Sequence, residues 1–141
     1  MFTIEKPKEI HLKSWKKLIN ECALTNTFWY NEIDFDLFWN CIFRENFFAY
    51  AAKNNDNFMG IVISRINETY YEKNLVLEAV YVAPEFRKLG VARALINRIE
   101  AVATEQKLDL IVYGIEKSNL LAQKLFKNYL EITRTRYIKK A

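Results

Sequence analysis

Residues that build metal sites and disulfide frameworks are scarce in this chain. It has one histidine, His11, and two cysteines, Cys22 and Cys41, among 141 residues. Their spacing is not that of metal ligands, so we expect neither a metal site nor a disulfide scaffold. Both cysteines fall within apolar, helix-like patterns, which favours buried free thiols.

Long hydrophobic runs and linkers are also lacking. No apolar run approaches the ~20 residues that a membrane-spanning helix needs, and the N-terminal MFTIEKPKEI has no signal-peptide core. We therefore expect a cytoplasmic protein without a membrane partner. With three glycines, two prolines and 51% hydrophobic residues, the chain is expected to form a single domain over residues 1–141.

The excess of positive charge is modest, at +4. Basic residues are scattered along the chain, except for a group near the end that comprises Arg134, Arg136, Lys139 and Lys140. No motif typical of RNA or DNA binding accompanies them. We therefore expect no nucleic-acid partner, and solvated lysines explain most of the excess.

Residues 75–100 organise the rest of the chain. Leu75–Val82 is aliphatic and β-branched, which predicts a buried strand that Pro84 ends. The following helix has an apolar face at helical spacing, formed by Ala92, Leu95, Ile96 and Ile99. A compact turn, Arg87–Ala92, joins the two elements.

This turn has the properties of a phosphate site. A strand that leads through a glycine turn into a helix aims unpaired N–H groups at one point, where the helix dipole is positive. Arg87, Lys88 and Arg93 add positive charge, and Gly90 allows a ligand to approach the main chain closely. The alternative is an ordinary strand–turn–helix corner.

The segment V-x-P-E-F-R-x-x-G-V-A resembles the acyl-CoA motif of the GNAT superfamily of N-acetyltransferases, [RQ]-x-x-G-x-[GA]. Arg87, Gly90 and Ala92 stand at its three defining positions. The resemblance implies an α/β (α+β) fold with a central, mostly antiparallel mixed sheet and flanking helices, and acetyl-CoA as acyl donor with no metal. The donor contacts that it implies are Val80, Tyr81, Val82, Arg87, Lys88, Leu89, Gly90, Val91, Ala92, Arg93, Asn119, Ala122 and Phe126.

The remaining pattern fits the order of elements that this resemblance implies. We expect strands at 2–5, 47–53, 58–66, 75–82, 108–115 and 131–140. Helices are expected at 8–24, 34–45, from the glycine turn through 100, and at 118–128, where Ser118 caps the last one. The first helix is expected to bury Ile10, Trp15, Leu18, Ile19 and Cys22, and the second Leu37, Phe38, Cys41 and Ile42.

A second family motif, N-x-x-A-x-x-x-Y, is met only in part. Asn119 and Ala122 match, but Phe126 replaces the tyrosine that the resemblance credits with protonating the departing CoA thiolate. Tyr113 or Tyr129 could substitute, or both are core or surface aromatics. A thiol with a pKa of about 8.5 leaves fairly well unaided, and general acid help contributes ~10²–10⁴-fold. We therefore expect a slower or differently assisted enzyme.

The acceptor side centres on Glu78. A primary amine with a pKa of about 10.4 is mostly protonated at pH 7, which costs ~4 kcal/mol for the reactive neutral form. A carboxylate within so apolar a strand is costly to bury, so Glu78 is expected to face the acceptor as base or amine ligand. The alternative is a structural ion pair with a nearby Lys or Arg.

The resemblance also places beside the acceptor a loop that comprises Phe28, Trp29 and Tyr30 with the acidic residues Glu32, Asp34 and Asp36. Aromatic rings and carboxylates favour a cationic acceptor, with Trp29 and Tyr30 as substrate contacts. A hydrophobic clamp next to an acidic first helical turn is the alternative.

Together these features predict an acetyl-CoA-dependent N-acetyltransferase that acts by direct attack in a ternary complex. The acceptor is expected to be a small cationic amine such as a polyamine or amino sugar. Two alternatives remain open: a peptide or protein N-acetyltransferase, and a non-catalytic acyl-CoA-binding module, which Phe126 favours. Many relatives dimerise, so a homodimer is also open.

Overall fold

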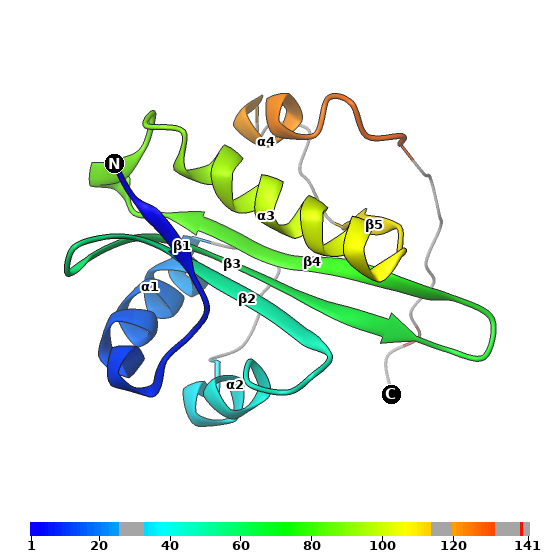
Figure 1. Ribbon diagram of the computed structural model, residues 1–141, viewed down its shortest axis with the longest axis horizontal. Helices are drawn as coiled ribbons and strands as arrows, with labels where there is room; N and C mark the ends of the chain where they lie inside the picture. The colour runs from blue at the N-terminus through cyan, green and yellow to red at the C-terminus, as the bar shows by residue number, and fades with distance from the viewer. Residues whose placement is uncertain (26–32, 114–119, 132–138, 140–141) are drawn as a thin grey trace.

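The protein is built around a twisted sheet with helices on both faces (Figure 1). The computed structural model describes residues 1–25, 33–113, 120–131 and 139. Its strands lie in the order in which they occur in the chain, antiparallel from the first to the fourth, with the fifth parallel to the fourth. They are β1 (Thr3–Glu5), β2 (Phe47–Asn54), β3 (Asn57–Glu68), β4 (Lys73–Val82) and β5 (Leu110–Val112).

The helices divide between the two faces of this sheet (Figure 1). On one face lie α1 (Leu12–Thr25), which follows the short 3₁₀ turn η1 (Glu9–His11), and α2 (Phe35–Cys41). On the other lie α3 (Val91–Gln106) and α4 (Leu120–Leu125). A second 3₁₀ turn, η2 (Pro84–Phe86), connects β4 to α3.

The core on the α1 and α2 face pairs large helical side chains with small strand residues. Trp15 and Trp39 are buried against a row of alanines that includes Ala49, Ala51 and Ala79. Because alanine leaves room above the sheet, the indole rings can fill the space between helix and strand at native packing density. This core positions α1 and α2 beside the C-terminal half of β4.

The core on the α3 face is aliphatic. The buried stripe of α3 comprises Val91, Leu95, Ile96, Ile99, Val102 and Ala103. It packs on Leu75 and Leu77 of β4 and on Val62 of β3. Burying a Leu or Ile side chain stabilises the fold by roughly 1.5–3 kcal/mol, so this stripe fixes the start of α3 relative to the end of β4.

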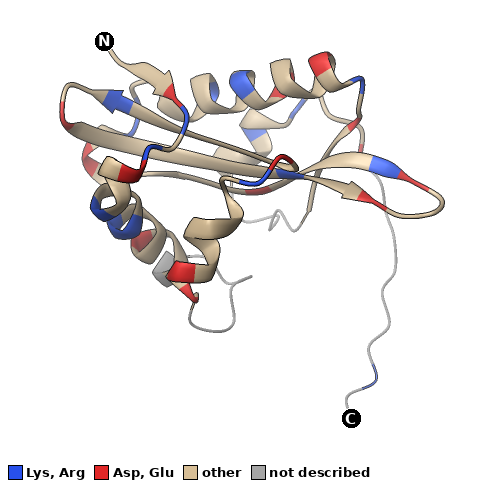
Figure 2. Ribbon diagram, turned by 60° about the horizontal axis from the view of Figure 1, so that its bottom comes forward, with Lys and Arg blue, Asp and Glu red and all other residues tan. Residues whose placement is uncertain are grey.

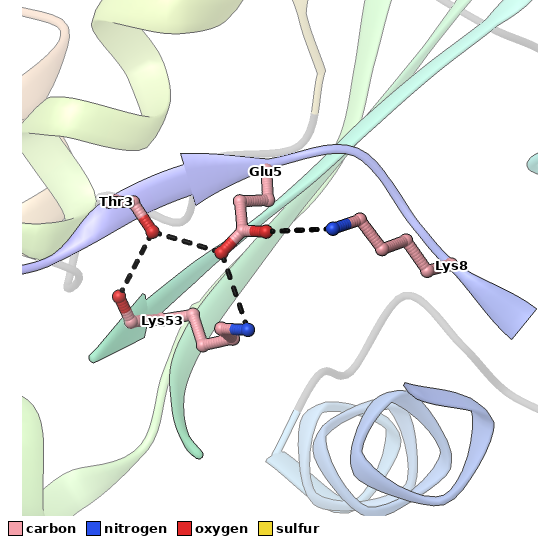
Figure 3. A network of polar contacts seen from close by, with 4 residues as sticks. All are labelled: Thr3, Glu5, Lys8 and Lys53. Atoms are coloured by element: carbon pink, nitrogen blue, oxygen red, sulfur yellow. Dashed lines mark hydrogen bonds and ion pairs between the residues drawn. The ribbon is translucent and has the colours of Figure 1, made fainter. Parts of the chain in front are cut away.

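Edge strand β1 is held by a charged network (Figure 3). The Glu5 carboxylate lies 3.3 Å from Lys8 Nζ and 3.5 Å from Lys53 Nζ. The Thr3 hydroxyl lies 3.0 Å from the same carboxylate and, with the two lysines, lowers the pKa of Glu5. Charged side chains on an edge strand discourage pairing with other chains.

Charged residues lie mainly on helices, turns and strand ends (Figure 2). Within the residues that the structure describes, no helix is long and apolar enough to cross a membrane.

The fold class and the order of elements expected from the sequence are confirmed as far as α4. The expected strand at 108–115 is described as Leu110–Val112, and the helix at 118–128 as Leu120–Leu125. Ser118 and nearly all of the expected last strand lie outside the described residues. The strands expected at 58–66 and 75–82 are both longer, because β3 continues to Glu68 and β4 begins at Lys73.

Several expected burial positions are wrong. Ile10 is 85% exposed because it lies in η1, before the helical spacing of α1 begins. Leu37 is 56% exposed, and α2 instead buries Phe35 and Trp39. The second helix also ends at Cys41, four residues early, in a turn that leads into β2. Burial of Cys22 is confirmed, and it raises the pKa of that thiol to about 11, whereas Cys41 is only half-buried.

Candidate active site

A β-bulge at Glu78 divides β4 into two halves. Leu77 pairs with Ser64 of β3 and Ala79 pairs with the adjacent Ile63, so Glu78 is an extra residue with no partner on β3. A bulge re-aims the side chains that follow it. Leu75 and Leu77 face α3 before the bulge.

After the bulge, the alternation of faces is reversed. Val80 and Val82 pack on the α3 side, whereas Ala79 and Tyr81 pack on the α1 side. Among the described residues, the pairing of β4 with β5 ends at Leu77 and Val112, one residue before the bulge, and Tyr113 is not part of a strand. The expected donor contacts Val80 and Val82 therefore lie on the half of β4 that extends beyond this pairing.

Tyr81 has its side chain on the face opposite to the two valines. Its hydroxyl donates a hydrogen bond to Glu21 of α1 at 3.1 Å. Burial, with the Glu21 carboxylate, raises the pKa of Tyr81. If an acetyl donor binds on the α3 side of the sheet, only the backbone of Tyr81 can contact it.

Arg87 ties the turn to the end of β4. Its Nε donates to the carbonyl of Val82 at 2.9 Å, and its guanidinium lies over the Tyr81 ring, 5.8 Å from the centroid. The Arg87 side chain therefore holds the turn against the end of β4, and its positive charge lies next to the turn.

The start of α3 is open. Lys88 and Gly90 both adopt left-handed backbone conformations, with φ of +65° and +81°. A turn with such residues can direct several neighbouring backbone N–H groups toward one point and so form an anion-binding concavity. Gly90 is the N-cap and provides no side-chain cap, and a Cβ placed on it would meet no atom within 4 Å. Among the described residues, none therefore fills the space beside Gly90, where the first-turn N–H groups of α3 begin.

The three other turn residues differ in environment. Leu89 is exposed, Val91 is buried in the α3 core, and Ala92 is half-buried. Arg93 directs its guanidinium to the Leu125 carbonyl at 3.1 Å, which fastens the C-terminal end of α4 to α3. Its side chain is thus engaged, and only its backbone N–H contributes to the open helix start.

Phe126 is only 9% exposed and belongs to the α3 core, with its ring 5.1 Å from that of Tyr129. Ala122, one turn earlier, is half-buried beside it. Asn119 lies outside the described residues. The structure thus brings together Ala122 of α4 and Phe126, which directly follows α4, but leaves the site without a hydroxyl at position 126.

The two substitute tyrosines have different surroundings. Tyr113 is exposed. The Tyr129 hydroxyl is buried without a hydrogen bond of ordinary geometry to a described residue, although burial and the nearby Glu100 carboxylate raise its pKa to about 12. Its neighbours Glu100 and Arg93 are on α3, so its position is that of a core aromatic.

Glu78 forms an ion pair with Arg65 of β3 through Arg65 Nε. Their side chains are 32% and 37% exposed, so solvent reaches both. This is the structural ion pair that the sequence left as the alternative, and the role of Glu78 as base stays a prediction. Arg65 was not identified from the sequence, because its proximity depends on strand register.

The expected acceptor loop can be placed only in part. Trp29 and Tyr30 lie outside the described residues. Asp34 accepts a hydrogen bond from the Leu37 backbone N–H at 3.1 Å and so caps α2. In the described parts of the chain, no cluster of His, Cys, Asp and Glu is suited to hold a metal.

Solved structures with the same fold include several acetyltransferases. The chain resembles aminoglycoside N-acetyltransferase AAC(6')-Iy, solved with a CoA-containing bisubstrate analogue, at a TM-score of 0.81 and 19% identity over 100% of this chain and 99% of that one. For aminoglycoside 6'-N-acetyltransferase AAC(6')-Ih from Acinetobacter baumannii the TM-score is 0.79 and the identity 19%, over 100% of this chain and 99% of that one. For a ribosomal-protein-alanine N-acetyltransferase from Brucella melitensis the TM-score is 0.77 and the identity 17%, over 99% of each chain.

Sequence comparisons address the family directly. Among curated proteins, none matches the chain significantly. The sequence model of the Acetyltransferase (GNAT) family matches residues 12–130, a span that runs from the start of α1 past α4 and includes the turn and the bulge. The chain therefore belongs to the GNAT family of acetyltransferases.

Proposed function

We propose that residues 1–141 form a single cytoplasmic N-acetyltransferase domain that moves an acetyl group from acetyl-CoA to the primary amine of a small cationic molecule. The observation that carries this proposal is the open start of α3 at Gly90, next to the bulged half of β4. Membership of the GNAT family and the CoA ligand of AAC(6')-Iy support the choice of donor.

The residues present fit this donor. The N–H groups from Lys88 to Arg93 would hold the pyrophosphate, since a helix start favours anions. The α3-facing residues Val80 and Val82 would flank the acyl arm, and Ala122 of α4 and Phe126, the residue after α4, belong to the same apolar cluster. Acetyl-CoA supplies an activated thioester whose carbonyl carbon accepts the amine.

The chain itself supplies orientation, charge stabilisation and proton removal. Backbone N–H groups at Val80–Val82 would stabilise the developing oxyanion. Glu78 would take the proton that the attacking amine loses, directly or through one water. The new C–N bond forms as the C–S bond breaks, and the thiolate leaves without a tyrosine proton because Phe126 has none to give.

Release of free thiol from acetyl-CoA against a panel of amines tests this proposal. We expect release that depends on a primary amine and an acetylated product of matching mass. If acetyl-CoA bound but no amine caused release, the non-catalytic acyl-CoA-binding function would replace this one.

Peptide N-acetylation is the second candidate, and the likeness to the ribosomal-protein-alanine N-acetyltransferase favours it. A panel of short peptides with free N-termini, assayed beside small amines of equal concentration, separates the two. Higher kcat/KM for the peptides would favour this candidate.

A further inference from the structure

The ion pair of Arg65 and Glu78 leaves much of the guanidinium unused. Arg65 donates to Glu78 through Nε, and its terminal nitrogens donate to no other residue within the described chain. These nitrogens form the fork that binds carboxylates bidentately. Both side chains are about one-third exposed, so a ligand can reach them from solvent.

The surroundings of this pair are apolar. Arg65 lies in register between Phe47 of β2 and Val76 of β4, which is buried. Glu78 is the bulged residue, and the next residue, Ala79, belongs to the core under α1 and α2. One cation and one carboxylate therefore stand together at the margin of an apolar face.

We propose that Arg65 and Glu78 together recognise the acceptor, and that they select a primary amine with a carboxylate close to it, the α-amino acid class. The inference rests on the proposed acetyltransferase function and changes its acceptor from a small cationic amine to a zwitterionic one. The ammonium group of the acceptor would pair with the Glu78 carboxylate, and the carboxylate of the acceptor would accept hydrogen bonds from the terminal nitrogens of Arg65.

Electrostatics separates this acceptor from a plain polyamine. A carboxylate already paired with arginine presents no net charge to a polycation, and the guanidinium repels additional ammonium groups. When a zwitterion binds, Glu78 pairs with its ammonium group and Arg65 with its carboxylate. All four charges therefore keep a counter-ion. Solvent-accessible ion pairs contribute little net stability, so opening this pair costs little.

Matched acceptors test the inference. We would measure kcat/KM for lysine against cadaverine and for phenylalanine against phenethylamine, because each amine is the amino acid without its carboxylate. We expect the amino acid to be preferred at least tenfold in each pair. Arg65→Met keeps the length and removes the charge, and should bring the preference close to one through KM. Arg65→Lys should restore part of it.

Lys53→Met is the matched control, since Lys53 pairs with Glu5 on the far edge of the sheet (Figure 3). It should leave the preference unchanged. Equal kcat/KM within the wild-type pairs, or an unchanged preference in folded Arg65→Met, would overturn the inference while the acetyltransferase function stands. Absence of turnover with every amine would instead overturn both. The wild-type comparison needs no variant, so it decides even if Arg65→Met fails to fold.

Discussion

The Tyr81 hydroxyl donates a hydrogen bond to the Glu21 carboxylate at 3.1 Å, and this contact joins the end of β4 to α1. The Arg87 guanidinium lies over the same ring. Tyr81 therefore connects α1, on one face of the sheet, with the turn that precedes α3, where we propose that the acetyl donor binds.

We predict that Tyr81→Phe destabilises the protein by about 1.5–3 kcal/mol, as expected for a hydrogen bond to a charged group. Urea unfolding at pH 7 measures this change. Lys53→Met, which removes an exposed ion pair, is the control and should cost less. Equal losses in the two variants would mean that the Tyr81 contact adds nothing beyond a surface pair.

Gly90→Val should weaken acetyl-CoA binding at least tenfold. The branched side chain would occupy the open space before α3, and the left-handed φ of +81° would be strained. Calorimetric titration measures the affinity. Gly90→Asn separates the two causes, because asparagine tolerates this backbone conformation but still fills the space. Wild-type affinity in a folded Gly90→Val would remove the donor from this site.

Phe126→Tyr should raise kcat or shift its pH profile, because the new phenol can protonate the leaving thiolate. Steady-state assays from pH 6 to 9 test this, with acetyl-CoA affinity measured in parallel. Lower turnover with unchanged affinity would show that the site requires an apolar group at this position and obtains its proton elsewhere.

Tyr129 should titrate as a buried group and not as the catalytic acid. Its pKa is raised to about 12 in the folded protein, so folding favours the neutral phenol. That contribution to stability is complete below pH 10 and is lost as the pH rises towards 12. Tyr129→Phe should therefore show a smaller loss of stability across this range and keep wild-type turnover. A large fall in kcat would identify Tyr129 as the missing acid.

Glu78→Gln should leave acetyl-CoA affinity intact and lower turnover at neutral pH at least tenfold. The amide keeps the shape and can still accept from Arg65, but it cannot take the amine proton. Partial recovery is expected at higher pH, where more acceptor is deprotonated. A rate unaffected across that range would leave Glu78 as a structural partner of Arg65.

The turn could be predicted from the sequence because its information is local. The residues that define it are close together in the sequence: Arg87, Gly90 and the apolar stripe of α3. The bulge at Glu78 could not, since an unbroken apolar run such as Leu75–Leu77 carries no alternation that would reveal a slip. Arg65 was missed for the same reason: only the register of β3 against β4 brings it to Glu78.

The errors in α1 and α2 have a related cause. Helical spacing includes Ile10 and Leu37 in apolar faces, but a 3₁₀ start and the rotation of a short helix leave both exposed. Periodicity gives the existence of a helix more securely than its end points or its rotation.

The bulge also allows the chemistry of Glu78 and the geometry of β4 to be tested separately. Leu77 and Ala79 already pair with the adjacent residues Ser64 and Ile63, so deleting Glu78 would leave the side chains after it on their present faces. The deletion would remove the bulge together with the carboxylate, and the contents of the two cores would stay in place. A substitution at this position therefore tests the carboxylate alone, whereas a single-residue deletion also straightens the strand.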